Sequence, residues 1–341
     1  MRRRILVTGG AGFIGSAFVR KYAGKYDIVV LDNLDYSADL ERLREVEDEF
    51  RFIEGDVRDP SLISRVFEEE HPDVVVHFAA QTHVDRSIFF PSDFYSTNVM
   101  GTLNLLLAAI KSGIDKFIHI STDEVYGEIP PGEERKFSEE DPLRPSSPYS
   151  SSKASADLMV QSFVRTYSLP AVIARPSNCY GPWQYPEKLI PYSILRLIRG
   201  ERITLYGDGS NVRTWLHVYD CVRAIDLLIE RGETGEIYNI GSLEERSNRE
   251  IARLILGEMN LDDTFVEYVA DRPGHDFRYA LNIDKIRGLG WEPEIHVEEG
   301  IKETVNWFLK HRDWLLAKYS QVEEFAKTFR SSALKFIGKH K

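Results

Sequence analysis

The chain has 341 residues, 43% of them hydrophobic, and a formal net charge of −11 at pH 7. This length suits one large domain or two coupled domains, and the negative charge argues against a nucleic-acid-binding surface. The two cysteines, Cys179 and Cys221, have neither CxxC nor metal-ligand spacing, so we expect no zinc site and no disulfide framework. The apolar run near the N-terminus is too short for a signal peptide, and no stretch approaches the length of a membrane span. We therefore expect a cytoplasmic protein with no membrane partner.

The first half of the chain alternates short β-branched runs with helical patterns. Six apolar runs are nearly continuous, which is typical of strands buried on both faces of a parallel sheet: RILVTG, DIVVLDN, RFIEGDV, DVVVHFAA, KFIHIST and AVIARPS. Apolar residues at helical spacing between 98 and 110 predict a helix among them. This order predicts an α/β fold with a doubly wound parallel sheet.

After about residue 177 the pattern changes. Pro and Gly become frequent, and patterns of helices and short strands are mixed. We expect a smaller, mixed α/β lobe that closes over a ligand. The segment EIYNIG, 236–241, predicts a strand that rejoins the main sheet.

The stretch TGGAGFIGS follows the first predicted strand and opens a helix, with glycines at 9, 12 and 15. Such glycines allow a tight turn and close approach of the backbone to a pyrophosphate, and the helix N-terminus favours phosphates. Asp32 ends the second predicted strand, where an acid can bind a ribose hydroxyl and repel a 2′-phosphate. The pattern predicts an NAD site rather than an NADP site. The alternative, a turn and a helix cap, does not explain the glycines and the acid together.

Other predicted cofactor contacts come from the ends of later strands. Asp56 and Val57 follow the third strand, and small residues after the fourth let a cofactor lie close. Thr97 and Asn98 begin the next helix and can act as caps instead. The predicted cofactor residues are Gly9, Gly12, Phe13, Ile14, Gly15, Asp32, Asn33, Asp56, Val57, Phe78, Ala79, Ala80, Thr97, Tyr149, Lys153 and Cys179.

The stretch SPYSSSKAS places Tyr149 and Lys153 four residues apart, on one face of a helix. A phenol with a pKa of about 10 is a poor base at neutral pH. A nearby ammonium and the positive nicotinamide ring favour the phenolate, which could then remove a hydroxyl proton as hydride leaves the adjacent carbon. The alternative is a pair of residues on a surface helix.

With these two motifs the chain resembles the extended short-chain dehydrogenase/reductase family over about residues 1–312. Members act on nucleotide sugars. Within the family the chain is similar to the dTDP-glucose 4,6-dehydratases, through the segments THVDRSI, STDEVYG, SSPYSSSKAS, SNCYGPWQYPEKLIP, YGDGSNVRTWLHVYD and DRPGHDFRYALN. Relatives that only epimerise or decarboxylate lack the Thr-Asp-Glu triplet of STDEVYG.

The resemblance implies an NAD-dependent lyase that oxidises C4 of a nucleoside-diphosphate glucose, eliminates water across C5 and C6, and reduces C6. It implies Asp123 as the acid, Glu124 as the base, and Thr122 as a partner of the C4 oxygen, beside Tyr149 and Lys153. An acid that is protonated at neutral pH needs a raised pKa, through burial or through its neighbouring carboxylate. The alternative is that the two acids cap a helix or lie solvated in a loop.

The resemblance also implies a substrate site. Its predicted residues are Thr82, Thr122, Asn178, Lys188, Leu189, Tyr206, Arg213, Asn248, Asp271 and His275. Lys188 and Arg213 would face the diphosphate and Tyr206 would stack on the base, whereas Asn248 could cap a helix instead. Cys179 stands where the family usually has Asn, and the sequence before YGDG leaves thymine and uracil both open.

The resemblance further implies a division of the chain and a homodimer. We expect an NAD-binding domain from 1–176 and about 212–243, a nucleotide-sugar-binding lobe from about 177–211 and 244–312, and a C-terminal helical extension, 313–341. Helices near 98–112 and 148–168 would pair between subunits, with Leu103, Leu106 and Met159 buried there.

In the extension, Val322, Phe325, Phe329 and Phe336 lie roughly on one helical face. We expect that face to pack on its own chain or on a subunit partner, rather than on a membrane surface.

Two other functions fit part of this pattern. A 4-epimerase or decarboxylase of the same fold would share the cofactor loop and the Tyr–Lys pair. A non-catalytic NAD-binding sensor commonly loses its Tyr or Lys, and this chain keeps both.

Overall fold

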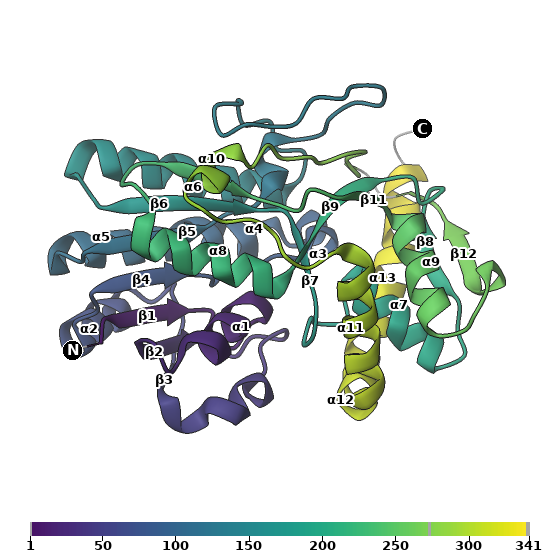
Figure 1. Ribbon diagram of the computed structural model, residues 1–341, viewed down its shortest axis with the longest axis horizontal. Helices are drawn as coiled ribbons and strands as arrows, with labels where there is room; N and C mark the ends of the chain where they lie inside the picture. Colours follow the sequence, from purple (N-terminus) through teal and green to yellow (C-terminus); the bar gives the residue numbers. More distant parts are fainter. Residues whose placement is uncertain (1, 272–273, 339–341) are drawn as a thin grey trace.

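The computed structural model describes residues 2–271 and 274–338, with side chains in the last helix up to residue 328. Its centre is a seven-stranded parallel sheet in the order β10-β6-β5-β4-β1-β2-β3 (Figure 1). The strands are β1 (Arg4–Thr8), β2 (Asp27–Asp32), β3 (Phe50–Glu54), β4 (Val74–His77), β5 (Lys116–Ile120), β6 (Ala171–Pro176) and β10 (Ile237–Ile240). All six predicted strands are present. The prediction that the segment 236–241 rejoins the sheet is also confirmed, because β10 pairs with β6.

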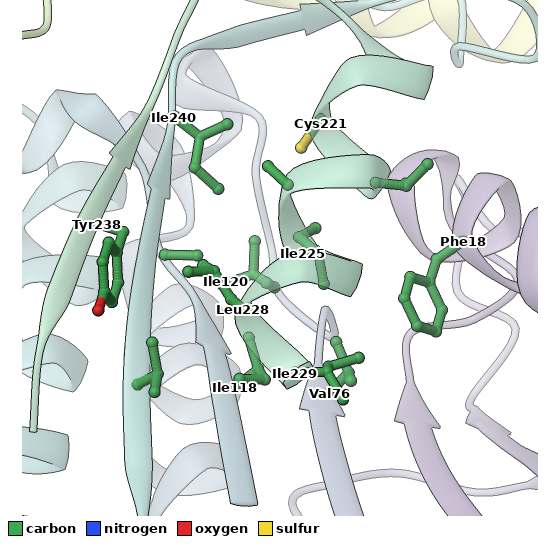
Figure 2. Packing of buried hydrophobic residues seen from close by; sticks show 14 of the residues in the cluster. Phe18, Val76, Ile118, Ile120, Cys221, Ile225, Leu228, Ile229, Tyr238 and Ile240 are labelled. Carbon is green, nitrogen blue, oxygen red and sulfur yellow. The ribbon is translucent and has the colours of Figure 1, made fainter. Parts of the chain in front are cut away.

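Helices cover both faces of this sheet, so the predicted doubly wound α/β fold is confirmed. On one face lie α1 (Phe13–Tyr22) and α8 (Val218–Arg231), and Figure 2 shows Ile225 of α8 near strand residues such as Ile118, with Phe18 of α1 farther along the same core. On the other face lie α2 (Pro60–Glu70), α5 (Thr102–Ser112) and α6 (Pro148–Tyr167). Burial on both faces explains why the strands are continuously apolar instead of alternating.

The second lobe has its own core between three helices and two small sheets. A three-stranded sheet contains β7 (Asn178–Tyr180), β9 (Val212–His217) and β11 (Glu245–Ser247), and a parallel pair contains β8 (Ile203–Tyr206) and β12 (Val266–Val269). Against them pack α7 (Leu189–Ile198), α9 (Asn248–Glu258) and α11 (Val297–Lys310). The predicted mixed α/β lobe is therefore present, while its exact boundaries remain a prediction.

The shorter elements connect these layers. They are η1 (Leu40–Glu49), α3 (Val84–Phe89), α4 (Pro91–Tyr95), η2 (Ser96–Gly101), η3 (Asp123–Tyr126), η4 (Asp263–Phe265), α10 (Asp284–Gly288), α12 (Arg312–Ala317) and α13 (Tyr319–Gly338). In the described part of the chain, no helix combines the length and apolarity needed to cross a bilayer.

Of two predictions about helix surfaces, one is wrong and the other is confirmed for the described residues. Leu106 is fully buried in the core of its own chain, so the prediction that it is buried between subunits is wrong. Leu103 and Met159 pack against the same core and are only half-buried. In the extension, Phe329 and Phe336 lie outside the residues whose side chains the structure describes, whereas Val322 is buried and Phe325 half-buried against this chain.

Candidate active site

A cavity of about 420 Å³ lies at the carboxyl ends of the main-sheet strands, where the second lobe meets the sheet. This is the edge at which doubly wound sheets bind ligands. A smaller cavity of about 90 Å³ beside it shares residues such as Gly9, Gly12 and Phe78. Among the predicted site residues, all of which the structure describes, Asp271 alone lines neither cavity. Asp271 contacts a residue that does line the larger cavity, since its Oδ1 lies 2.6 Å from Nδ1 of His275.

The glycine loop forms a cradle that larger residues would fill. A Cβ at Gly9, whose φ is +71°, would lie 2.6 Å from the backbone nitrogen of Ala79, and one at Gly15 would lie 2.2 Å from the carbonyl oxygen of Gly9. Helix α1 begins at Phe13, and within the described chain no side chain caps its N-terminus. Its first N–H groups are therefore available to an anion. The cradle fits the pyrophosphate of a dinucleotide.

The smaller cavity holds the polar groups predicted to meet the adenosine. Asp32 is buried at the end of β2 and accepts hydrogen bonds from the backbone N–H groups of Ala11 and Leu34, each at 2.9 Å. Burial raises the pKa of Asp32, although these two hydrogen bonds oppose the shift. Asn33 donates to Asp56 at 3.0 Å, and hydrogen bonds from Arg58 hold the pKa of Asp56 at about 2. Asp56 is therefore ionised at neutral pH, and Asp32 keeps carboxyl oxygens at the end of β2 that can accept a hydrogen bond from a ribose hydroxyl.

The proposed capping role of Asn98 is wrong. Its side chain accepts a hydrogen bond from the Gln81 backbone at 2.8 Å and donates to the Gln81 carbonyl and to the Ser152 hydroxyl. These bonds tie the end of β4 to helix α6. Thr97 lines the smaller cavity, where the sequence placed it.

Tyr149 and Lys153 both face the larger cavity from the first turns of α6. Pro148 and a Ser147–Ser150 capping box start this helix, which places the pair one turn apart. The Lys153 ammonium donates to the carbonyl of Ile120 at 2.6 Å, and burial lowers the pKa of Lys153 to about 8.

The phenol of Tyr149 is less acidic than the sequence suggested. Burial, and after it the charge of Glu124, raises the pKa of Tyr149, although a hydrogen bond with Thr122 lowers it. The expectation that the ammonium of Lys153 favours the phenolate of Tyr149 is therefore not met by the protein alone. The other expected source of positive charge that would favour this phenolate is the nicotinamide ring of NAD⁺.

The two adjacent acids, Asp123 and Glu124, begin a single helical turn, η3, after β5. The residue that caps this turn is Thr122, whose hydroxyl accepts from the Glu124 N–H at 3.3 Å. Asp123 is 1% exposed, and within the described chain its Oδ2 has no hydrogen-bond partner. The alternative that Asp123 is a cap or a solvated loop acid is therefore wrong.

The protonation state of Asp123 follows from its surroundings. Burial, together with the charge of Glu124, raises the pKa of Asp123 to about 8, against an opposing effect of Arg213. At neutral pH the side chain is mostly a neutral carboxylic acid that lines the cavity. It can therefore donate a proton to a bound ligand.

The substrate side carries the predicted cations and polar groups. Lys188 donates to the Thr82 carbonyl at 2.8 Å. The buried guanidinium of Arg213 donates to the carbonyls of Asp276 and Phe277, at 2.9 and 3.1 Å. The helix cap predicted as an alternative for Asn248 is wrong, because Ser247 and Glu250 form that cap. Asn248 instead lines the cavity.

The comparisons with known proteins agree with this geometry. A family model described as GDP-mannose 4,6 dehydratase matches residues 6–304. The chain is 49% identical to the low-salt glycan biosynthesis protein Agl12 of Haloferax volcanii, over 89% of this chain and 98% of that protein. It superposes on the dTDP-glucose 4,6-dehydratase DesIV of Streptomyces venezuelae, solved with NAD bound, with a TM-score of 0.87 and 46% identity, over 91% of this chain and 98% of that one.

This chain belongs to the 4,6-dehydratase family. The resemblance to dTDP-glucose 4,6-dehydratases predicted from the motifs is thereby confirmed. The fold is shared more widely. A UDP-glucose 4-epimerase of Thermotoga maritima superposes with a TM-score of 0.85 at 35% identity, over 90% of this chain and 99% of that one. The dehydratase chemistry therefore has to be argued from the site and not from the fold.

Several residues that line the dehydratase cavity were not predicted. They are His83, Arg86, Tyr185, Glu187, Tyr192, Val322, Phe325 and Ala326, among others. The first four lie inside the family segments THVDRSI and SNCYGPWQYPEKLIP, and Tyr192 directly follows the second, so the motifs themselves were a usable signal. The last three belong to the C-terminal extension, where no family motif pointed to the cavity.

Proposed function

We propose that this protein is an NAD-dependent hydro-lyase that converts a nucleoside-diphosphate glucose, dTDP-glucose, into its 4-keto-6-deoxy derivative. One observation carries the proposal. Asp123 is a buried carboxylic acid with a pKa raised to about 8, and it lines the same cavity as Glu124, Tyr149 and Lys153. Elimination of water needs such an acid beside a base, whereas epimerisation at C4 does not.

The glycine loop, Asp32 and Lys153 would hold the dinucleotide. Bound NAD⁺ would supply the hydride acceptor for C4 and later the hydride donor for C6. Tyr149 removes the proton of the C4 hydroxyl, and Thr122 orients the oxygen that becomes the ketone. The C4 ketone then acidifies the C5–H bond.

The acid pair carries the second stage. Glu124 removes the C5 proton, and Asp123 gives its proton to the C6 hydroxyl, which leaves as water. A C5–C6 double bond conjugated to the C4 ketone forms. Protonation of C5, together with the hydride that the bound cofactor would supply to C6, would complete the product with no net change in the cofactor.

The test is incubation with dTDP-glucose and UDP-glucose in parallel, followed by mass spectrometry of the products. We expect a product lighter than the substrate by one water, with no net accumulation of NADH. A product of unchanged mass would indicate a 4-epimerase, and loss of carbon dioxide would indicate a decarboxylase. Binding of NAD without conversion of either sugar nucleotide would indicate a sensor.

We also infer that the enzyme is a cytoplasmic homodimer. The helices α4 to α6, the π-helical segment η2 and the residue between α3 and α4 carry exposed large apolar side chains on neighbouring elements: Phe90, Tyr95, Met100, Leu107 and Leu158. Such a cluster is typical of an interface between subunits. Sedimentation of the purified protein as a monomer at micromolar concentration would contradict the dimer.

A further inference from the structure

The cavity has a wall that the family motifs do not supply. The family model ends at residue 304, and helix α13 (Tyr319–Gly338) lies beyond it. Three of its side chains, Val322, Phe325 and Ala326, line the larger cavity together with the catalytic residues. Their spacing places them on one face of the helix. We propose that α13 is part of the substrate-binding site and forms an apolar wall against the nucleoside-diphosphate sugar.

One set of contacts ties the extension to the sheet domain. The Asp39 carboxylate accepts from the Trp314 indole N–H at 2.9 Å and pairs with the Lys318 ammonium at 2.9 Å. Asp39 also caps η1, which follows β2. The guanidinium of Arg42 lies 5.7 Å from the ring centre of Trp314. The segment that leads into α13 is therefore fixed against the chain that follows β2.

A second set of contacts ties α13 to the other lobe. The Tyr185 hydroxyl donates to Gln321 at 3.1 Å, and the Tyr192 hydroxyl donates to the buried carboxylate of Glu323 at 3.1 Å. Both tyrosines line the cavity. Because α13 is held on both sides, its apolar face is fixed where the two lobes meet.

The wall also orients a charged side chain. Phe325 packs its ring edge-on to His83, with ring centres 5.3 Å apart. The Arg86 guanidinium lies 4.2 Å from the ring centre of Phe325 and 3.9 Å from that of Tyr36, so it is stacked against two rings. The carboxylate of Glu187 lies 3.8 Å from Arg86. Such stacking restricts the guanidinium, since a cation over an aromatic face is attracted by it.

This role deepens the proposed function and rests on it. An apolar wall removes water from the bound sugar nucleotide and contributes to binding in every step. A contact that is equally strong in the ground state and the transition state lowers KM without raising kcat. The extension should therefore affect KM for the sugar nucleotide and leave the binding of NAD unchanged.

The test uses the full-length, NAD-loaded enzyme and dTDP-glucose. For Phe325→Ala we expect KM to rise about tenfold or more, the range for loss of an apolar contact in a pocket, with kcat changed much less. Ala326→Phe should raise KM as well, by filling the cavity. The matched control is Ser320→Phe, which adds the same bulk at an exposed position of the same helix and should keep the wild-type KM. Bound NAD per subunit and the melting temperature are measured for every variant.

The outcomes are distinguishable. Wild-type KM in folded Phe325→Ala and Ala326→Phe overturns the role of the extension and leaves the proposed function intact. If Phe325→Ala does not fold, Ala326→Leu decides between the same two outcomes, because it removes no contact of the helix. If the wild-type enzyme converts neither dTDP-glucose nor UDP-glucose, the proposed function is overturned, and a substrate-binding role for α13 with it.

Discussion

The cofactor half of the cavity and the substrate half are built from different parts of the chain. In the cofactor half the main elements are a glycine turn and the N-terminus of α1, which act through the backbone, together with two acids that follow strands. In the substrate half they are buried side chains from many elements, such as Asp123 after β5, Arg213 on β9 and Phe325 on α13. Backbone cradles recognise what dinucleotides share, whereas side chains determine the substrate and the reaction. Substitutions in the two halves should therefore separate cofactor binding from chemistry.

The largest expected effect is in the substrate half. Asp123→Asn keeps the shape of the side chain and removes its transferable proton. Product formation should fall by about 10²- to 10⁴-fold, the usual contribution of a general acid, while bound NAD stays at the wild-type level. Oxidation at C4 should continue, so reduced cofactor should build up on the enzyme and be seen by its absorbance.

The control for this variant is Tyr149→Phe, which should show neither reduced cofactor nor product, because the first step fails. Normal turnover by Asp123→Asn would remove Asp123 from the elimination. The same conclusion would follow if Asp123→Asn were inactive and no reduced cofactor formed.

The next effect is in the cofactor half. An alanine at Gly9 would clash with the backbone of Ala79 and would hold a positive φ. Binding of NAD should weaken by about 100-fold in Gly9→Ala, in line with a few kcal/mol of clash and strain, as measured by titration of the NAD-free protein.

The matched control is Gly113→Ala. Gly113 also has a positive φ, +66°, but no described atom lies within 4 Å of the Cβ that would be added. This variant should lose stability by about 1 to 2 kcal/mol and bind NAD normally. Equal NAD affinities for the two variants would show that the cradle does not depend on Gly9.

The same division explains which features could be predicted from the sequence. Six strands and β10 were predicted because buried parallel strands are continuously apolar, and the glycine loop because only glycine tolerates these contacts. Asp123 was assigned through the family motif, but its burial depends on packing beneath β5 that no local pattern encodes. Arg213 is held by carbonyls more than sixty residues away, a contact that spacing cannot reveal.

The C-terminal extension shows most clearly what the sequence pattern could not predict. Its apolar face at Val322 and Phe325 indicated that the helix packs on something. The pattern did not indicate that the partner is the rim of the cavity, because amphipathicity gives the face of a helix and not its position in the fold.

A smaller effect concerns Asp32, a cofactor contact that works through side-chain charge. Asp32→Asn keeps the shape and one of the two acceptor oxygens, and it removes the repulsion of a 2′-phosphate. We expect NAD affinity to fall by about tenfold, as for loss of one charged hydrogen bond, and the preference for NAD over NADP to shrink. The ratio of the two dissociation constants is the measurement. An unchanged ratio would place the adenosine ribose elsewhere.

The smallest expected effect near neutral pH is the change of the reaction rates with pH. It compares the elimination, which uses Asp123 and Glu124, with the oxidation, which uses Tyr149 and Lys153. Asp123 must be protonated to act, and its pKa is raised to about 8, so the elimination should be nearly independent of pH around neutrality and fall as pH rises through that value. Lys153 also has a pKa of about 8, but it serves the oxidation at C4. The two losses can be separated in single-turnover experiments with the NAD-loaded enzyme. Above pH 8 the rate of cofactor reduction reports the Tyr149–Lys153 pair, and the rate of cofactor reoxidation reports Asp123. In Asp123→Asn the residual reoxidation should no longer fall with pH over this range. If it falls as steeply as in the wild type, the proton donor is a different group and the buried acid after β5 only shapes the cavity.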